Sequence, residues 1–353
     1  LGDAFCSDMA TAYRNAITKV NQPPWRGYPL WLALLCLLVT TASAAQGRFD
    51  AGLLWRIERA GSTPSYLFGT LHSDDPAVVD LAAPVRQAFD QADAVTLEVT
   101  LDPESLLTLT QALLMNEGKT LDALLGAAVF ERAVEAMAGY GIPDSMVARM
   151  KPWAVAVTLM TPPTQTGVVL DHVLYRKALA EGKPVDGLET VAEQVELFDS
   201  LTLEQQIDLL RDTLEHLDDI ERMLMELRQA WLQRDLARLV AINSAALRDS
   251  DPQLATLFNQ RIILDRNRRM AERLESRLHE GGRFIAVGAL HLPGEQGLLE
   301  LLEQHDVEVT AAPTGTDNGI LLAEGARVEE PVAPAKAWAI SGRLRWLSMT
   351  AGS

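Results

Sequence analysis

The sequence predicts an α/β protein (helix-rich) in which a mixed central β-sheet is flanked by helices and interrupted by a large helical insertion. Three observations lead to this prediction. Strand-like and helix-like segments alternate along most of the 353-residue chain. An unbroken amphipathic stretch of roughly thirty residues begins at Leu203. Finally, 48% of the residues are hydrophobic, which is enough to build a packed core.

Short runs rich in β-branched, leucine and aromatic residues predict the strands of the sheet. The turn-forming residues 60–64 separate the first two runs, which therefore predict a β-hairpin. The predicted strands are residues 53–58 (LLWRIE), 66–70 (YLFGT), 94–99 (AVTLEV), 184–188 (PVDGL), 283–287 (RFIAV) and 307–310 (VEVT).

Helical patterning occupies most of the chain between these strands. Gly and Pro residues divide the segment 103–160 into several short predicted helices. Thr190 and Glu193 have the spacing of a capping box, so a helix is predicted to begin there. Further helices are predicted around residues 85–92, 170–181 and 294–304.

The amphipathic stretch 203–231 places apolar residues at steps of three and four without Gly or Pro, which predicts one long helix. A polar turn at residues 248–251 separates it from a second helix predicted at 252–279. The simplest packing for the two is a long antiparallel helical hairpin. An oligomeric coiled coil is the alternative that the same pattern allows, and the oligomeric state stays open.

The N-terminal residues have the parts of a secretory signal. An apolar run at residues 30–39 follows Arg14, Lys19 and Arg26 and precedes small residues that end at Ala44. Because the run is shorter than the roughly 18 to 20 residues of a spanning helix, we expect cleavage after Ala44 and export to the periplasm or the extracellular space. The alternative is an uncleaved leader that anchors the chain in the inner membrane. Both cysteines precede residue 45, so the exported chain has no thiol.

These features divide the chain into a signal peptide (1–44), one domain (45–311) and a C-terminal tail (312–353). The tail is rich in Ala, Pro and Gly, and we expect it to be loosely ordered. Its tryptophans, Trp338 and Trp346, lie beside basic residues, which allows a weak contact with a membrane surface. The formal net charge of −17 argues against a protein that binds nucleic acid through a broad basic surface.

One short motif, Gly-x-Leu-His, occurs twice, each time at the end of a predicted strand. Residues 69–72 (GTLH) follow one strand and residues 288–291 (GALH) follow another, while none of the other four histidines has Gly three residues before it. Gly permits a sharp turn at a strand end, so the following side chains enter the crevice at the carboxyl edge of the sheet. We therefore expect His72 and His291 to point at one site.

Glu98, near the end of the strand AVTLEV, adds a carboxylate to the two imidazoles. Such ligands suit a divalent ion such as Mn, Co or Zn with a position open for water. A bound ion lowers the pKa of its water to around 7, which activates the water for attack on a carbonyl. His72, His291 and Glu98 are therefore predicted metal ligands, and Glu98 is alternatively a general base. The competing interpretation makes Glu98 a strand-end cap and the histidines polar plugs.

Two further charged residues are candidates for the same site. Arg266 lies in a basic cluster on a predicted helix, where its guanidinium can stabilise an oxyanion or bind a substrate carboxylate. Glu189 follows a predicted strand and is either a second site carboxylate or the first-turn acid of a helix. Asp171 and His172 open a predicted helix, and we interpret them as an N-cap acid and a surface histidine.

Several segments, in order, resemble the TraB/PrgY/GumN family, which is related to the Tiki proteases. The resemblance covers residues 53–310 and neither the leader nor the tail. It implies a metal or catalytic centre at His72, Glu98 and His291, accompanied by Arg266 and Glu189. The segments that carry it are LLWRIE with YLFGTLHSDDP, VTLEV, GKPVDGLETVAEQ with LFDSL, DRNRRMAERL and FIAVGALHLPGEQGLLELL.

The leading hypothesis is an exported, metal-dependent hydrolase that cleaves a peptide or a similar amide, with Arg266 as electrostatic stabiliser. A second hypothesis is a non-catalytic protein that sequesters a peptide or another small ligand in the same crevice. A third is a structural protein that acts through its helical hairpin, which leaves the repeated motif unexplained.

Overall fold

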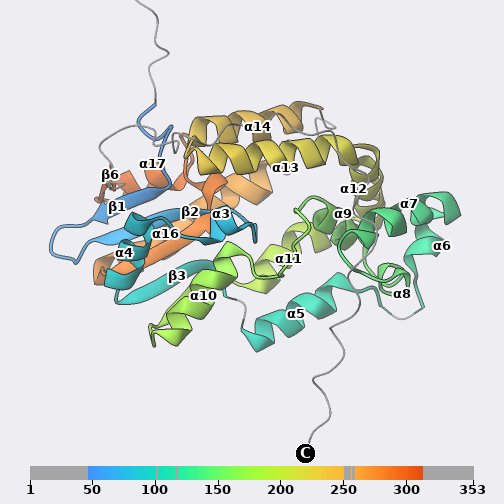
Figure 1. Cartoon of the computed structure of the whole chain (residues 1–353), viewed down its shortest axis with the longest axis horizontal. Helices are drawn as coiled ribbons and strands as arrows, with labels where there is room; N and C mark the ends of the chain where they lie inside the picture. The colour runs from blue at the N-terminus through green and yellow to red at the C-terminus, as the bar shows by residue number, and fades with distance from the viewer. Residues whose placement is uncertain (1–46, 101, 117, 250–255, 257–258, 313–353) are drawn as a thin grey trace, which may run out of the picture.

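The computed structural model describes residues 47–312, except 101, 117, 250–255, 257 and 258. Within this part, a six-stranded sheet has the order β4-β3-β5-β2-β1-β6 and carries helices on both faces (Figure 1). The predicted signal peptide (1–44) and the predicted tail beyond residue 312 lie outside the described residues. No helix in the described part is long and apolar enough to cross a membrane.

Every predicted strand is present, and the sheet is mixed as expected. β1 and β2 form the predicted antiparallel hairpin, and β6 pairs antiparallel with β1. β2, β5, β3 and β4 are parallel neighbours. The strands are β1 (Leu54–Glu58), β2 (Ser65–Thr70), β3 (Ala94–Val99), β4 (Val185–Glu189), β5 (Arg283–Gly288) and β6 (Glu308–Ala311).

The helices form two groups around two hydrophobic cores. The short helices expected between residues 103 and 160 are confirmed, whereas the helix expected at 294–304 is shorter. Those that surround the sheet are α3 (Pro76–Val79), α4 (Ala83–Gln91), α10 (Leu170–Ala180), α13 (Leu217–Leu232), α14 (Leu236–Asp249), α16 (Asp265–Glu280) and α17 (Leu298–Glu303). Those of the second core are α5 (Pro103–Leu113), α6 (Leu121–Leu125), α7 (Ala127–Ala138), α8 (Asp144–Val147), α9 (Pro152–Leu159), α11 (Val191–Asp199) and α12 (Leu203–Glu215).

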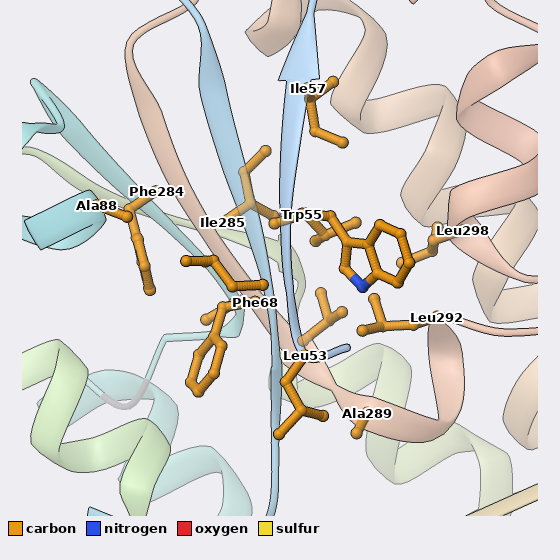
Figure 2. Close-up of a cluster of buried hydrophobic side chains, with 14 of the residues drawn as sticks. Leu53, Trp55, Ile57, Phe68, Ala88, Phe284, Ile285, Ala289, Leu292 and Leu298 are labelled. Atoms are coloured by element: carbon orange, nitrogen blue, oxygen red, sulfur yellow. The ribbon is translucent and has the colours of Figure 1, made fainter. Parts of the chain in front are cut away.

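β5 is buried on both faces, because helices cover both sides of the parallel part of the sheet. On one face Phe284 packs against Phe89 of α4, with ring centroids 5.2 Å apart. On the opposite face Trp55 of β1 lies toward Leu298 of α17 (Figure 2). The sheet core therefore holds the strand that leads to the second Gly-x-Leu-His motif rigidly in place.

The prediction of a single long helix at 203–231 is wrong, because the chain forms two helices, α12 and α13, that meet at His216. The backbone of His216 has φ −114° and ψ 24°, which no α-helix contains. Leu210 and Leu214 of α12 pack into the second core, while Ala230 and Trp231 of α13 pack into the sheet core. One apolar stripe thus serves two cores that lie in different directions, and the helix breaks between them.

A helical hairpin is present, but it is not the predicted pair of helices 203–231 and 252–279, because it is formed by α13 and α14. The chain turns between α13 and α14 (Figure 1), where Arg234 has a positive φ of 60° and the Asp235 carboxylate accepts a hydrogen bond from the N–H of Arg238. Leu236 and Leu239 of α14 are buried in the sheet core. α16 instead packs against β4 and α17, after a π-helical turn.

Candidate functional site

The carboxyl ends of four parallel strands carry residues predicted for the site. β2 and β5 pair with Thr70 opposite Gly288, so the two motifs leave neighbouring strands at the same edge. Glu98 lies one residue before the end of β3, the other neighbour of β5, and Glu189 ends β4. The sheet order therefore brings to one edge the strand ends that lead to His72, Glu98, Glu189 and His291.

Gly69 is required by a close approach between the two motifs. A Cβ at this position would lie 2.7 Å from Cδ1 of Leu292 and 3.1 Å from Cα of Ala289. The Gly69 carbonyl also accepts a buried hydrogen bond from Nε1 of Trp231 at 3.0 Å. A Cβ at Gly288 would make only ordinary contacts of 3.4 Å. Packing therefore requires glycine at position 69 in the first motif, whereas a side chain at position 288 in the second motif would meet only ordinary contacts.

His291 is a buried imidazole whose orientation is set by an amide. It ends a 3-10 turn and is 4% exposed. Its Nδ1 lies 2.6 Å from Oδ1 of Asn267, whose Nδ2 donates to the Gln296 carbonyl at 2.7 Å. Because the amide oxygen accepts, Nδ1 carries the proton and Nε2 carries a lone pair. Burial lowers the pKa of His291 to about 4 although the Glu98 charge opposes this shift, so the ring is neutral at neutral pH.

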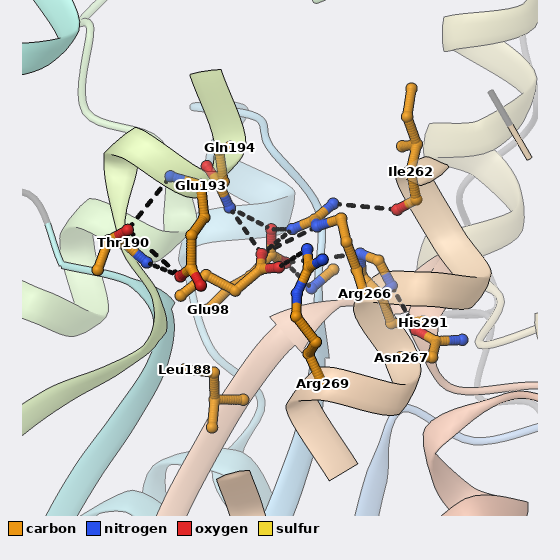
Figure 3. A network of polar contacts seen from close by, with 12 residues as sticks. Glu98, Leu188, Thr190, Glu193, Gln194, Ile262, Arg266, Asn267, Arg269 and His291 are labelled. Carbon is orange, nitrogen blue, oxygen red and sulfur yellow. Dashed lines mark hydrogen bonds and ion pairs between the residues drawn. The ribbon is translucent and has the colours of Figure 1, made fainter. Parts of the chain in front are cut away.

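Glu98 is an ionised carboxylate held at both oxygens. Oε2 accepts the backbone N–H of Gly288 at 2.9 Å, and Oε1 accepts Nε2 of Gln194 at 3.0 Å and pairs with Arg266 (Figure 3). Burial by itself would raise the pKa of Glu98, but the Arg266 charge, His291 and the Gly288 N–H lower it to about 2. Nε2 of His291 lies 3.9 Å from Oε2, beyond hydrogen-bond distance.

Arg266 lies buried between two carboxylates, with 6% of its surface exposed. Its Nη2 pairs with Glu98 and, at 2.6 Å, with Glu189, to which Nε also donates at 2.9 Å. Nη1 donates to the Ile262 carbonyl at 3.2 Å. These four hydrogen bonds use most of the five N–H groups of a guanidinium. Arg266 is therefore the counter-charge of two glutamates, with little capacity left for a substrate carboxylate.

Glu189 is 4% exposed and belongs to this ion-pair cluster. Besides Arg266, it pairs with Nη2 of Arg269 at 3.2 Å. The interpretation of Glu189 as a first-turn helix acid is wrong, because Thr190 is the N-cap of α11 and Glu193 is the acid of its first turn. The capping box predicted for Thr190 and Glu193 is confirmed.

The sequence predicted Asp171 to be the N-cap acid of α10. This prediction is wrong, because the N-cap is Val169. The Asp171 carboxylate points to the sheet edge, where the Thr70 hydroxyl donates to Oδ1 at 2.8 Å. Burial and the nearby Glu98 charge raise the pKa of Asp171, whereas the Thr70 hydrogen bond and His72 oppose this shift. His172 is half-buried and not a surface residue.

His72 differs from His291 in being exposed to solvent. Within the described residues, no group of three or more His, Cys, Asp or Glu side chains is close enough to hold a metal ion. In a tetrahedral site with bonds of about 2 Å, two ligand atoms lie about 3.3 Å apart, so His291 Nε2 and Glu98 Oε2, now 3.9 Å apart, would have to approach each other slightly to share one ion. The donor types of His291 and Glu98 suit a divalent metal. The structure does not bring His72 to them, so the prediction that His72 and His291 point at one site is not met by the described side-chain positions.

No motif in the sequence points to Asp171, Gln194 or Asn267, although the structure places all three at this edge. A signal exists for Asn267 alone. It lies on the buried face of α16, at helical spacing from Met270, Ala271 and Leu274. A polar residue within an apolar stripe indicates a buried hydrogen-bond partner.

A sequence model of the TraB/PrgY/gumN family matches residues 53–311. The chain belongs to this family. The matched range contains all six strands described above and both Gly-x-Leu-His motifs. The resemblance drawn from the sequence is therefore confirmed.

Relatives of this TraB/PrgY/gumN chain include proteins named metalloproteases. "Metalloprotease TIKI1" of Danio rerio is 25% identical over 314 residues, which cover 74% of this chain and 63% of that protein. "Metalloprotease TIKI1" of Homo sapiens is 24% identical over 358 residues, covering 83% and 70%. "Uncharacterized protein YbaP" of Escherichia coli (strain K12) is 24% identical over 277 residues, covering 76% and 99%.

The match thus spans less than two thirds of the Danio rerio TIKI1. No solved structure matches the chain.

Proposed function

We propose that this chain is an exported, metal-dependent hydrolase that cleaves a peptide or a similar amide bond. One observation carries the proposal: a neutral imidazole with a free Nε2 and an ionised carboxylate, His291 and Glu98, lie 3.9 Å apart at the carboxyl edge of the sheet. The relatives named metalloproteases, at 24% to 25% identity, support the same class of reaction.

In this proposal His72 and His291 bind the metal ion, and Glu98 binds it or accepts a proton from water. A bound Mn, Co or Zn ion would supply a Lewis acid and lower the pKa of water near the substrate carbonyl. Asn267 keeps His291 in the tautomer that presents Nε2 to the ion. The ligand nitrogen of His291 is thus prepared before any ion binds.

Arg266 acts in this proposal through Glu98. Its charge keeps Glu98 ionised at neutral pH, as a metal ligand or a general base requires. Glu189 holds the Arg266 guanidinium in place, because it pairs with Nε and with Nη2, the nitrogen that also pairs with Glu98. In this proposal Arg266 stabilises the charge of Glu98 and not a charge on the substrate. Glu189 contributes by positioning Arg266.

The decisive experiment combines metal content with peptide cleavage. Purified protein is incubated with Mn, Co or Zn, dialysed and subjected to elemental analysis, and the same samples are tested against a peptide library. We expect about one ion per chain and cleavage for the wild type, and loss of both for His72→Ala and His291→Ala. His279→Ala is the matched control, because His279 is exposed on the last turn of α16.

A wild type that holds no stoichiometric metal and cleaves nothing contradicts the proposal. Metal binding without cleavage favours a protein that sequesters a peptide or another small ligand. Cleavage that survives both histidine substitutions contradicts the assignment of the catalytic site to His72 and His291.

The export part of the proposal rests on residues 1–44. Its test is N-terminal sequencing of the protein recovered from the periplasm or the medium. We expect the mature chain to begin at Ala45. Recovery of an intact leader from the membrane fraction favours the anchored alternative.

A further inference from the structure

Asp171 is an acidic side chain at the site edge to which the proposed function gives no role. Its Oδ1 accepts a 2.8 Å hydrogen bond from Thr70, the last residue of β2, which is itself buried. His72 follows Thr70 by two residues. The Asp171 carboxylate interacts electrostatically with both the His72 imidazole and Glu98. Asp171 thus lies beside the one predicted ligand that the structure leaves exposed.

Hydrogen bonds that involve neither the Asp171 nor the His72 side chain hold the start of α10 against the loop that carries His72. The N–H of Leu170, directly before Asp171, donates to the Ser73 carbonyl, directly after His72, at 3.1 Å. Oδ2 of Asp74 accepts hydrogen bonds from the N–H of Gln165 at 2.7 Å and from the N–H and the hydroxyl of Thr166 at 2.6 and 2.9 Å. The start of α10 and the loop that carries His72 are therefore joined into one unit.

His291, the histidine of the second motif, shows how a neighbouring acceptor can fix an imidazole ring. Metal-binding imidazoles usually donate their second ring N–H to a carboxylate, a carbonyl or water, which fixes the ring. For His291 the acceptor is Asn267, which is fixed in turn by the Gln296 carbonyl. Near His72, the Asp171 carboxylate is fixed in a similar way, because its Oδ1 accepts a hydrogen bond from Thr70, two residues before His72. A carboxylate offers about four acceptor positions, so the Thr70 bond leaves room for an imidazole N–H.

We propose that Asp171 is a positioning residue that accepts an N–H hydrogen bond from His72 and turns this imidazole inward, toward Glu98 and His291. The inference rests on the proposed metal-dependent function. In this arrangement the two motif histidines are oriented by different partners, an amide on α16 and a carboxylate on α10. The Thr70 hydroxyl holds the carboxylate in the orientation that His72 requires.

The test measures the affinity of the purified protein for Mn²⁺ and Zn²⁺ alone, by titration calorimetry. We expect Asp171→Ala, which removes the acceptor, to weaken metal binding roughly 10- to 100-fold, the usual effect of losing such a partner. Thr70→Val should weaken binding in the same direction, and Thr70→Ser, which keeps the hydroxyl, should restore it. Asp208→Ala is the matched control, because Asp208 is exposed on α12, and its affinity should equal that of the wild type.

A second readout separates positioning from general structural damage. In ¹⁵N spectra of the metal-free protein, the ring nitrogens of His72 should shift in Asp171→Ala and stay unchanged in Asp208→Ala. A wild type that binds metal while Asp171→Ala binds equally well overturns the inference and leaves the proposed function intact. A wild type without metal overturns both. If Asp171→Ala does not fold, equal affinities of Thr70→Val and Thr70→Ser overturn the inference.

Discussion

Oδ1 of Asn267 lies 2.6 Å from Nδ1 of His291, so an amide on α16 determines which ring nitrogen of the second motif carries the proton. The two residues are 24 positions apart in the chain and are brought together by the packing of α16 on the sheet edge. The same helix carries Arg266, which pairs with Glu98. One helix therefore controls both the tautomer of the imidazole and the charge of the carboxylate.

Replacing Asn267 by Ala should lower the free energy of unfolding by about 1–3 kcal/mol, because the buried N–H of His291 loses its acceptor. Urea denaturation measures the change. The control is Asn116→Ala, an exposed position where we expect a change within about 0.5 kcal/mol. Equal losses in the two variants would contradict the role of the Asn267 amide.

Replacing Arg266 by Met should lower the free energy of unfolding by about 3–5 kcal/mol, because Glu98 and Glu189 are left without their buried counter-charge. The double variant Arg266→Met/Glu189→Leu should lose less, since one unpaired carboxylate is removed with the guanidinium. Guanidinium chloride denaturation of both variants tests this ordering.

The matched control for Arg266 is Arg268→Met. Arg268 forms an exposed ion pair with Asp265, so its loss should cost less than about 1 kcal/mol. A double variant less stable than Arg266→Met would argue that Glu189 stabilises the fold independently of Arg266.

The metal-free protein should lose stability as the pH falls from about 6.5 to 4. The pKa of His291 is lowered from its ordinary 6.5 to about 4, so the unfolded chain binds more protons than the folded one in this window. The pKa of Glu98, lowered from 4.5 to about 2, adds a loss of the same sign below pH 4.5. Urea denaturation from pH 3 to 8 should show a flatter profile between pH 6.5 and 4 for His291→Gln. An equally steep profile in that variant would assign the pH dependence to other groups.

Replacing Gly69 by Ala should cost about 1–3 kcal/mol, because the new methyl group would meet Leu292 Cδ1 at 2.7 Å. Gly139→Ala is the control, with a φ of −62° and its nearest neighbour at 3.7 Å. There we expect a small gain of about 0.4–1 kcal/mol through the unfolded state. Thermal unfolding of the two variants should therefore shift in opposite directions, and a shared direction would show that the contact at Gly69 relaxes without cost.

Replacing Asp74 by Ala should speed hydrogen exchange at the backbone N–H groups of Gln165 and Thr166, which lose their shared acceptor. Exchange at each amide is followed by NMR. Asp208→Ala, on the exposed face of α12, should leave both rates unchanged. Unchanged rates in Asp74→Ala would show that other contacts hold this loop.

All six strands and most helices follow from local patterns in the sequence. Strand residues alternate or form buried runs, and a capping box such as the one at Thr190 satisfies its own backbone within four residues. The break at His216 and the hairpin turn at Arg234 could not be predicted from local patterns, because neither contains a Gly or Pro residue. Both depend on the two hydrophobic cores. One part of the continuous apolar stripe packs into the second core and the other part packs into the sheet core.

The sequence by itself determined the α/β class and the family, and it placed Glu98 near a strand end, both motif histidines just after strand ends and Arg266 on a helix. Only the tertiary structure decided what these side chains contact: that Asn267 orients His291, that Arg266 is enclosed by Glu98 and Glu189, and that Asp171 turns to Thr70. The physical reason is that strand and helix formation depend on neighbours within a few residues. The partner of a buried polar group depends instead on which distant segments the hydrophobic core packs against it.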